Sequence, residues 1–142
     1  MRLLEGNRHR GRLTIARTNL MQAWLASDEP AQARALALIG WPEAAAYASR
    51  ASWADGLSLL AAMEHRPRAS AMLRGYADAP YAATQNTRQV AESITVERAE
   101  QLARQSLAAG EFKRLKAEGA LLRDADIAAI AFGERDEGTP AS

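Results

Sequence analysis

Two histidines are the only side chains in this chain whose ordinary pKa lies near neutrality, and they are far apart in the sequence. His9 lies among arginines, and His65 lies between Glu64 and Arg66. Metal binding and general acid–base catalysis need several such groups in one place. The two positions therefore predict surface histidines and no metal site.

Two pairs of carboxylates have spacings that a general acid and a general base could use. Asp124 and Asp126 form one pair, and Glu111 and Glu118 form the other. Catalysis would also need a pocket that shifts their pKa values. Asp124 is better explained as the N-cap of a helix, and Asp126 as a favourable charge in its first turn. Neither pair is predicted to be catalytic.

The sequence also lacks an activated nucleophile and a phosphate-binding loop. The chain has no cysteine, and no serine lies in the context of a nucleophile elbow. No Gly-x-x-x-x-Gly-Lys-Ser/Thr motif occurs. Ser58 and Ser70 lie on alanine-rich helix faces, where packing requires a small residue. These observations predict a protein that is not an enzyme and uses no cofactor or metal.

The elements that carry these side chains are predicted to be helices, and a proline-containing turn marks them twice. Residues 28–31 (Asp-Glu-Pro-Ala) and 65–68 (His-Arg-Pro-Arg) are 37 residues apart. Each proline suits the first position of a helix, where its missing N–H is not needed. A helix pair that recurs at this spacing is typical of an α-solenoid, close to the 34-residue tetratricopeptide period.

Composition agrees with one all-α domain. The chain has 142 residues, of which 48% are hydrophobic and only 6% aromatic, and much of the apolar share is alanine. Alanine favours helices, and no alternating run of strand formers occurs. The fold class we expect is therefore an all-α, tetratricopeptide-like solenoid of antiparallel helical pairs with a C-terminal helical cap.

Periodicity and turn residues give the expected boundaries. Glycine and proline at 40–42 should interrupt or end a helix, Pro80 should kink or end another, and Gly110 should be a left-handed C′ residue. The expected helices cover residues 10–26, 30 onward, 52–64, 67 onward, 88–109, 111–118 and 124–131. The expected domain organisation is a ragged end at 1–9, one domain at 10–133 (pairs 10–49 and 52–83, cap 88–133) and a disordered tail at 134–142.

Apolar stripes predict which residues form the core. Leucines and a tyrosine at helical spacing should form one contiguous core, namely Leu20, Leu57, Leu60, Leu73 and Tyr76. Val90, Ile94, Leu102 and Leu107 should be the main apolar residues of the long helix. A solenoid cut between repeats leaves an uncapped apolar face. That face should lie around Leu13, Ile15, Met21 and Leu25, and it would favour a homodimer.

Candidate partner-binding residues are few. Trp24 and Trp53 lie on apolar stripes and should pack in the core, whereas Trp41 and Tyr47 fall in the irregular segment between repeats. Trp41 and Tyr47 are therefore the aromatic candidates for partner binding. The most basic stretch lies near the N-terminus, and it adds two further candidates, Arg10 and Arg17.

Several stretches resemble a known family. Residues 59–69 (LLAAMEHRPRA) and 73–79 (LRGYADA), followed by 97–99 (ERA), 112–119 (FKRLKAEG) and 126–131 (DIAAIA), resemble the C-terminal tetratricopeptide-like region of large bacterial transcriptional regulators. Those proteins join a winged-helix or similar DNA-binding domain to a P-loop ATPase and a helical-repeat region. The resemblance implies a sensor or scaffold portion of such a regulator.

The function we expect is a non-enzymatic helical-repeat module for protein interaction or sensing. Its partner would be a protein, a peptide or other domains of a longer regulator. A net charge of +1 gives no reason to expect direct binding of nucleic acid or acidic membranes. No apolar run approaches the roughly 20 residues of a membrane span, and a cytoplasmic protein is expected. The alternative is a small nucleic-acid-associated helical protein that uses the basic N-terminal face.

Overall fold

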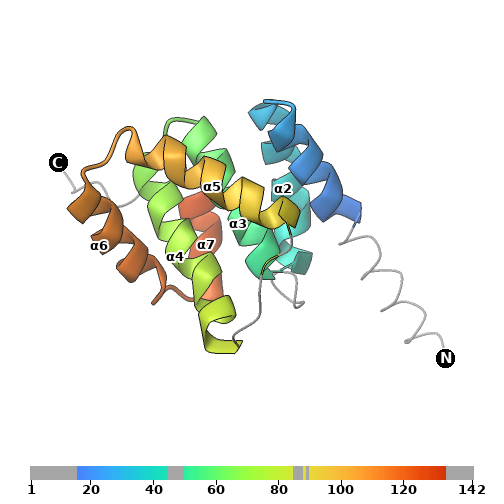
Figure 1. The fold of residues 1–142 in the computed structure, drawn as a ribbon. Helices are drawn as coiled ribbons and strands as arrows, with labels where there is room; N and C mark the ends of the chain where they lie inside the picture. Colours follow the sequence, from blue (N-terminus) through green and yellow to red (C-terminus); the bar gives the residue numbers. More distant parts are fainter. Residues whose placement is uncertain (1–15, 45–49, 85–87, 89, 134–142) are drawn as a thin grey trace.

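The computed structural model describes residues 16–44, 50–84, 88 and 90–133, and in these ranges it contains helices and no strand. Residues 16–26 are helical. The helices that follow are α2 (Pro30–Ala44), α3 (Arg50–Met63), α4 (Pro67–Thr84), α5 (Val90–Arg104), α6 (Ala109–Gly119) and α7 (Asp124–Phe132) (Figure 1). The all-α prediction is confirmed.

The two proline-containing turns have the same backbone conformation. Pro30 is the first residue of α2, and Pro67 is the first residue of α4, as their sequence context predicts. Two residues before each proline, the backbone is left-handed, with φ of 59° at Asp28 and 62° at His65. Each turn therefore stops one helix and starts the next at the same relative position.

Hydrogen bonds show that both turns are Schellman motifs. The N–H of Asp28 donates to the carbonyl of Leu25 at 3.1 Å, and the N–H of Glu29 donates to the carbonyl of Trp24 at 2.9 Å. These are the two bonds that define the motif. The equivalent bonds of the second turn run from His65 to Ala62 and from Arg66 to Ala61, at 3.1 and 2.8 Å.

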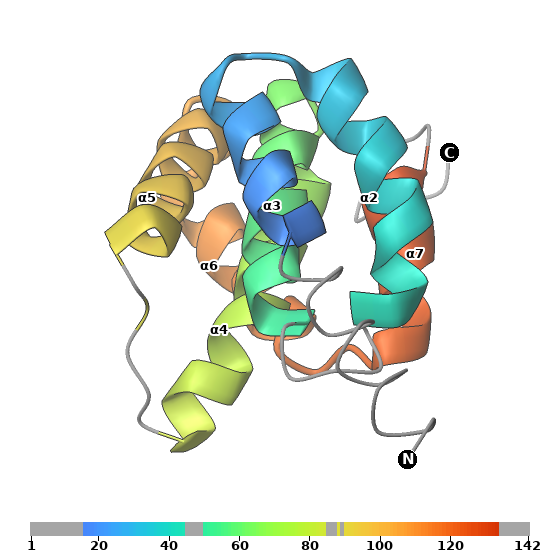
Figure 2. The same ribbon diagram turned by 90° about the vertical axis from the view of Figure 1, so that its right-hand side faces the viewer.

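Helix α3 lies at the centre of the molecule. It packs against α2, α4, α5 and α7, and Figure 2 shows it surrounded by these helices. Its buried positions run through nearly the whole helix and include Trp53, Asp55, Leu57 and Ser58. A helix buried on all sides has no polar face, so its few polar side chains must find partners inside the protein.

Helices α4 and α6 cross at two glycines. A Cβ atom on Gly75 would lie 1.8 Å from the carbonyl oxygen of Lys116. A Cβ atom on Gly119 would lie 1.8 Å from the carbonyl oxygen of Met72. The two helix backbones are therefore in direct contact, and only glycine fits at either point.

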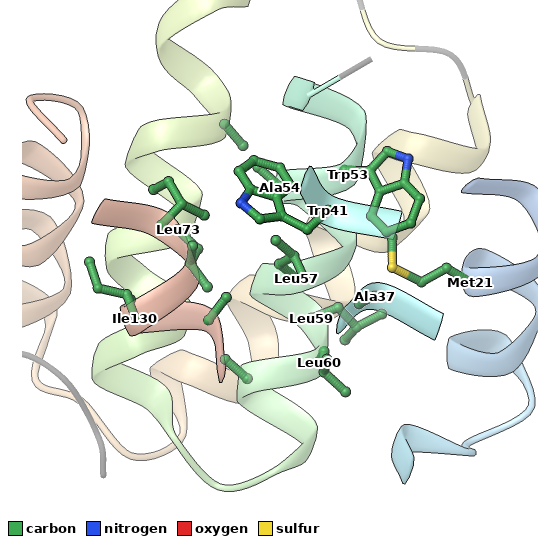
Figure 3. Close-up of a cluster of buried hydrophobic side chains, with 14 of the residues drawn as sticks. Met21, Ala37, Trp41, Trp53, Ala54, Leu57, Leu59, Leu60, Leu73 and Ile130 are labelled. Carbon is green, nitrogen blue, oxygen red and sulfur yellow. The ribbon is translucent and has the colours of Figure 1, made fainter. Parts of the chain in front are cut away.

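Four of the five residues that were predicted to form one contiguous core do so. Leu57, Leu60, Leu73 and Tyr76 belong to one buried cluster, parts of which are drawn in Figure 3. Leu20, which was expected to join them, is 47% exposed. Other residues form the buried side of residues 16–26. The buried face of this helix is therefore rotated about the helix axis from the face that was predicted.

Two residues of the apolar face that was expected to be free on the first helix are covered. Met21 and Leu25 are completely buried, and Met21 lies against α3 near Gly56. Leu13 and Ile15 lie outside the described residues. The two described members of this face are therefore core residues and provide no free apolar surface.

Helix α7 folds back onto earlier helices. It packs against α2, α3 and α4, and Figure 1 shows it behind α3 and α5, between α4 and α2. Its inward residues Ile127, Ile130 and Ala131 join the main core, as their spacing predicts. The helix therefore covers the junction of the two preceding pairs, which differs from the expected cap at the end of a stack.

Two predicted helix boundaries are wrong. Helix α2 continues through Pro42, although a proline inside a helix removes a backbone hydrogen bond. Helix α4 also continues through Pro80, so of the two outcomes expected there, a kink or an end, the helix does not end. Buried residues on both sides of Pro42, Trp41 and Ala44, hold α2 in place. Gly110 lies in the first turn of α6 without a left-handed φ, because α5 already ends at Arg104.

The exposed side of α5 also differs from the prediction. Val90 is 78% exposed and Ile94 is 60% exposed, although both were expected to be inward residues. Leu107 is buried, and Leu102 is partly buried against the core. Small residues, Ala99 and Ala103, occupy the buried face of α5 and allow close approach to its neighbours.

Candidate functional site

Trp41 is not available to a partner. Its side chain is only 4% exposed, and its ring meets the ring of Tyr76 edge-on, with centroids 6.5 Å apart. The continuation of α2 through Pro42 places Trp41 on the buried face of a helix. The expectation of a partly exposed aromatic side chain at Trp41 is therefore wrong, and the residue is part of the core.

The other predicted partner-binding residues do not come together in the described part of the chain. Arg17 pairs with Glu43, with 3.2 Å between Nη1 and Oε2. Tyr47 and Arg10 lie outside the described residues, as does His9. His65 is exposed, in agreement with the prediction of a surface histidine.

The carboxylate pairs have structural roles, but one role differs from the prediction. The N-cap of α7 is Arg123, and Asp126 accepts a hydrogen bond from its backbone N–H at 3.1 Å. Asp124 instead accepts a hydrogen bond from the hydroxyl of Tyr76. Burial and this carboxylate both raise the pKa of the Tyr76 hydroxyl. Glu111 and Glu118 form separate ion pairs with Arg68 and Arg114.

The described ranges show no other arrangement of side chains for metal binding, and their buried serines have structural partners. No group of three or more histidine, aspartate or glutamate side chains is placed there to hold a metal ion. Ser58 and Ser70 are buried and donate to each other's backbone carbonyls, both at 2.8 Å. The described helices include none with the length and apolarity to cross a bilayer.

A pocket of about 460 Å³ lies where the two Schellman turns face α5. We call it the paired-turn pocket. The two left-handed residues, Asp28 and His65, and the two following prolines line it. The remaining lining residues come from α3, α5 and the turn after α5, namely Ala62, Met63, Arg98, Leu102, Gln105 and Ser106.

Arg98 positions the first turn of this pocket. Its Nη1 donates to the carbonyl of Leu25 at 2.7 Å, and its Nη2 lies 3.4 Å from the carboxylate of Asp28. The guanidinium thus satisfies a carbonyl at the end of one helix and pairs with the side chain of the turn. The pocket has an apolar floor and a polar rim whose two opposite charges are matched.

A second polar cluster is buried between α3, α4, α5 and α6. We call it the ionic network, and its members are Asp55, Arg74, Asp78, Arg88, Glu100 and Lys116. Arg74 and Asp55 are completely buried, and Nη1 of the arginine lies 2.8 Å from Oδ1 of the aspartate. Arg88 binds both oxygens of Asp55, at 2.8 and 3.0 Å.

The outer members of the network connect it to α6. Arg74 and Arg88 also bind Asp78, the latter at 2.6 Å. Lys116 binds Asp78 at 3.0 Å and Glu100 at 3.3 Å. Three cations and three carboxylates are thus matched, which is the condition for burying charge in a protein.

The pKa values of the two aspartates shift in opposite directions. Burial raises the pKa of Asp55, and its bonds to Arg88 and Arg74 offset this only in part. Burial also acts on Asp78, but the charges and hydrogen bonds of its three cationic partners prevail and lower its pKa. Perturbed carboxylates of this kind occur at catalytic sites. Here both aspartates are bound by arginine, and no nucleophile lies among the members of the network. The contacts of the network run between helices, and we interpret its role as holding those helices together.

Partial signals for the paired-turn pocket are present in the sequence. The repeated turns identify the places where helices end, and aspartate is among the residues that tolerate a left-handed backbone. No pattern in the sequence indicates that both turns would face α5, or that Arg98 would reach the first of them. The pocket depends on contacts between residues about 70 positions apart, such as Arg98 and Asp28.

Comparisons with known protein families, curated proteins and solved structures found no match for this chain. The paired-turn pocket and the ionic network are therefore interpreted from their own geometry.

Proposed function

We propose that this protein is a non-enzymatic helical interaction module that binds a short peptide segment of a partner protein in the paired-turn pocket. The observation that carries the proposal is the repeated turn. Two helix ends of the same geometry, at Asp28 and His65, line one pocket on the same side of the helices. Repeat proteins use surfaces of this kind, which are built from equivalent positions of successive units.

The order of helix contacts supports a tetratricopeptide-like arrangement of the units. Helix α3 packs against α4 and α5, and α4 packs against α6. Helices in equivalent positions of the second and third pairs are thus neighbours, as in a solenoid, whereas α7 packs against both α2 and α4. Ala33 and Ser70, at equivalent positions of the second helices, are both completely buried. The fold-back of α7 would close such a short solenoid.

The chemistry of the pocket favours a peptide over a charged small molecule. Its volume suits a few side chains and is too small for a folded domain. Met63 and Leu102 offer contacts to an apolar side chain, whereas Gln105 and Ser106 are exposed and can bind peptide amide groups. Because Arg98 and Asp28 pair with each other, the rim has no excess charge to attract a phosphate.

Charge pairing in the described ranges gives no support to the alternative of nucleic-acid binding, whose basic N-terminal face lies mostly outside these ranges. Phosphate contacts require cations that are free to replace counterions. Every arginine in the described ranges lies within 4 Å of a carboxylate oxygen, namely Arg17, Arg34, Arg50, Arg66, Arg68, Arg74, Arg88, Arg98, Arg104, Arg114 and Arg123. A surface of matched charges is more suitable for a protein partner.

In a longer regulator of the family that the sequence resembles, such a module would have a defined task. Binding of a peptide segment in the pocket would change the state of the ATPase and DNA-binding parts. The proposal for this chain does not require that context, because the pocket is formed within the described helices.

Selection from a random peptide phage library on the immobilised full chain tests the proposal. Selected peptides are synthesised with a fluorescent label, and their Kd is measured by anisotropy. Gln105→Trp fills the pocket from an exposed turn and should abolish binding. Ala128→Trp places the same side chain at an exposed position of α7, outside the pocket, and should leave the Kd unchanged.

Two results would overturn the proposal. One is a library that yields no binder, and the other is a set of binders whose Kd is the same for the native chain and Gln105→Trp. A labelled single-stranded DNA that binds with a strong dependence on salt, in the absence of peptide binding, would support the nucleic-acid alternative.

A further inference from the structure

One short turn takes part in two different surfaces. His65 lines the paired-turn pocket, whereas its two neighbours in sequence, Glu64 and Arg66, face α7. The side chain of Arg66 is only 7% exposed, and that of His65 is on the surface. The backbone of this turn therefore sets the shape of the pocket and the position of the α7 contacts at the same time.

Arg66 holds the C-terminal end of α7. Its Nη1 donates to the carbonyl of Ile130 at 2.9 Å, and its Nη2 donates to the carbonyl of Ala131 at 2.7 Å. The last carbonyls of a helix have no partner within the helix, so these bonds satisfy groups that would otherwise be orphaned. Arg34 of α2 donates to the next carbonyl, that of Phe132.

Glu64 joins the two arginines. It accepts hydrogen bonds from Nη1 of Arg34 at 3.0 and 3.1 Å, and from Nη2 of Arg66 at 2.5 Å. The carboxylate fixes both guanidinium groups in the orientation that binds the helix end. We call these three residues, Glu64, Arg66 and Arg34, the α7 clamp.

Helix α7 depends on its surroundings for stability. It has nine residues, and an isolated helix of that length is not stable in water. Its order therefore comes from the apolar contacts of Ile127 and Ile130 and from the α7 clamp. A shift of the turn at residues 64–66 would move Arg66 and weaken the contacts that keep α7 docked.

We propose that peptide binding in the paired-turn pocket and docking of α7 are coupled through this turn, so that α7 regulates the pocket. The inference rests on the proposed function, because it requires a ligand in the pocket. The docked helix fixes Arg66 and hence the backbone at His65, which presents a preformed pocket. Release of α7 frees the turn and weakens peptide binding.

Coupling of this kind must be reciprocal. If docked α7 strengthens peptide binding by some factor, bound peptide must favour docking of α7 by the same factor. Couplings between sites in proteins are about 5- to 150-fold. A bound peptide should therefore slow hydrogen exchange of the α7 amides by a factor in this range.

The experiment combines hydrogen exchange of the full chain with measurement of peptide Kd, and a phage-selected peptide is the probe. Ile127→Ala loosens α7 from inside the core, at a residue that is completely buried and does not line the pocket. It should speed α7 exchange and weaken peptide binding by at least about fivefold. Ala129→Ser, at an exposed position of the same helix, should change neither quantity.

Hydrogen exchange of α7 can also be measured on the native chain with and without peptide. This measurement tests the coupling even if the Ile127→Ala variant does not fold. An α7 exchange rate that is the same with and without bound peptide would overturn the coupling. An unchanged Kd in a folded Ile127→Ala variant with faster α7 exchange would also overturn it. Either result leaves peptide binding itself established, whereas absence of any peptide binder overturns both the coupling and the proposed function.

Discussion

Gly75 and Gly119 are the glycines for which the structure predicts the largest cost of substitution. In each case an added Cβ would overlap a carbonyl oxygen of the facing helix at 1.8 Å, and a backbone atom cannot rotate away as a side chain can. Gly75→Ala or Gly119→Ala should therefore force α4 and α6 apart. We expect each to lower the free energy of unfolding by about 3 kcal/mol or more, measured by urea denaturation.

Gly110 supplies the matched control for this prediction. It lies in the same helix as Gly119, and a Cβ at this position would meet nothing within 4 Å. Gly110→Ala should raise the free energy of unfolding by about 0.5–1 kcal/mol, because alanine has the better helix propensity. Equal losses for Gly110→Ala and Gly119→Ala would show that the close crossing does not determine the stability.

Tyr81 should make stability depend on pH in alkaline solution. Burial and the nearby carboxylate of Glu92 raise the pKa of its hydroxyl to about 12, against an ordinary value near 10. The folded state thus favours the neutral phenol more than the unfolded state does. This contribution is fully present below pH ~10 and is lost as the pH rises from about 10 through 12.

Ultraviolet titration of the phenolate measures the pKa of this group directly. The difference between the native chain and Tyr81→Phe should be a single step centred near pH 12. A step centred at the ordinary value of about 10 would contradict the buried, hydrogen-bonded environment that the structure gives this side chain. Tyr81→Phe should also show a weaker loss of stability between those two pH values.

The helix at residues 16–26 and α3 are the first helices of the two predicted repeats, but they differ in burial. Leu57 is completely buried in α3, whereas Leu20, which lies 37 residues earlier, is 47% exposed. Leu57→Ala should cost about 2–5 kcal/mol of unfolding free energy, and Leu20→Ala less than about 1 kcal/mol. Chemical denaturation of both variants tests the pair. A loss below 1 kcal/mol for Leu57→Ala would contradict the central position of α3.

Helix starts were predicted well from the sequence because their signals are local. Pro30 and Pro67 begin helices, and Gly119 ends one, as their residue types indicate. The glycine and proline at 40–42 were misjudged for the opposite reason. Pro42 costs a hydrogen bond, but packing of the surrounding turns, which the sequence does not display, keeps α2 continuous.

Faces of helices were harder to predict than the helices themselves. An alanine-rich helix has few large residues to identify its buried side, so Val90 and Ile94 were assigned inward although alanines fill that face. Trp41 was taken for an exposed aromatic because its helix was expected to end there. The candidate site depended on how the two turns meet α5, for which the local sequence carries no signal.

The ionic network joins four helices, so its removal should affect the cooperative unfolding of the whole protein. Asp55→Ala would leave the fully buried Arg74 without its one completely buried ion-pair partner in the network, which should cost about 3–5 kcal/mol. Glu118→Ala removes an ion pair of similar length, 3.0 Å, in which both side chains are about half exposed. That change should cost less than about 1 kcal/mol. Urea denaturation measures the free energy of unfolding of both variants. Similar losses of stability for the two would show that the ionic network does not contribute more than an exposed ion pair.

The position of α7 has a consequence for the synthesis of the protein. A chain emerges from the ribosome N-terminus first, so α2, α3 and α4 are made well before residues 124–132. Until those residues emerge, the aromatic pair of Trp41 and Tyr76 lacks the neighbours that α7 contributes to their cluster. Each nascent chain therefore passes through a stage with an open apolar surface, which is the kind of surface that chaperones and proteases recognise. Premature stop codons before α7 should yield products that cells remove quickly.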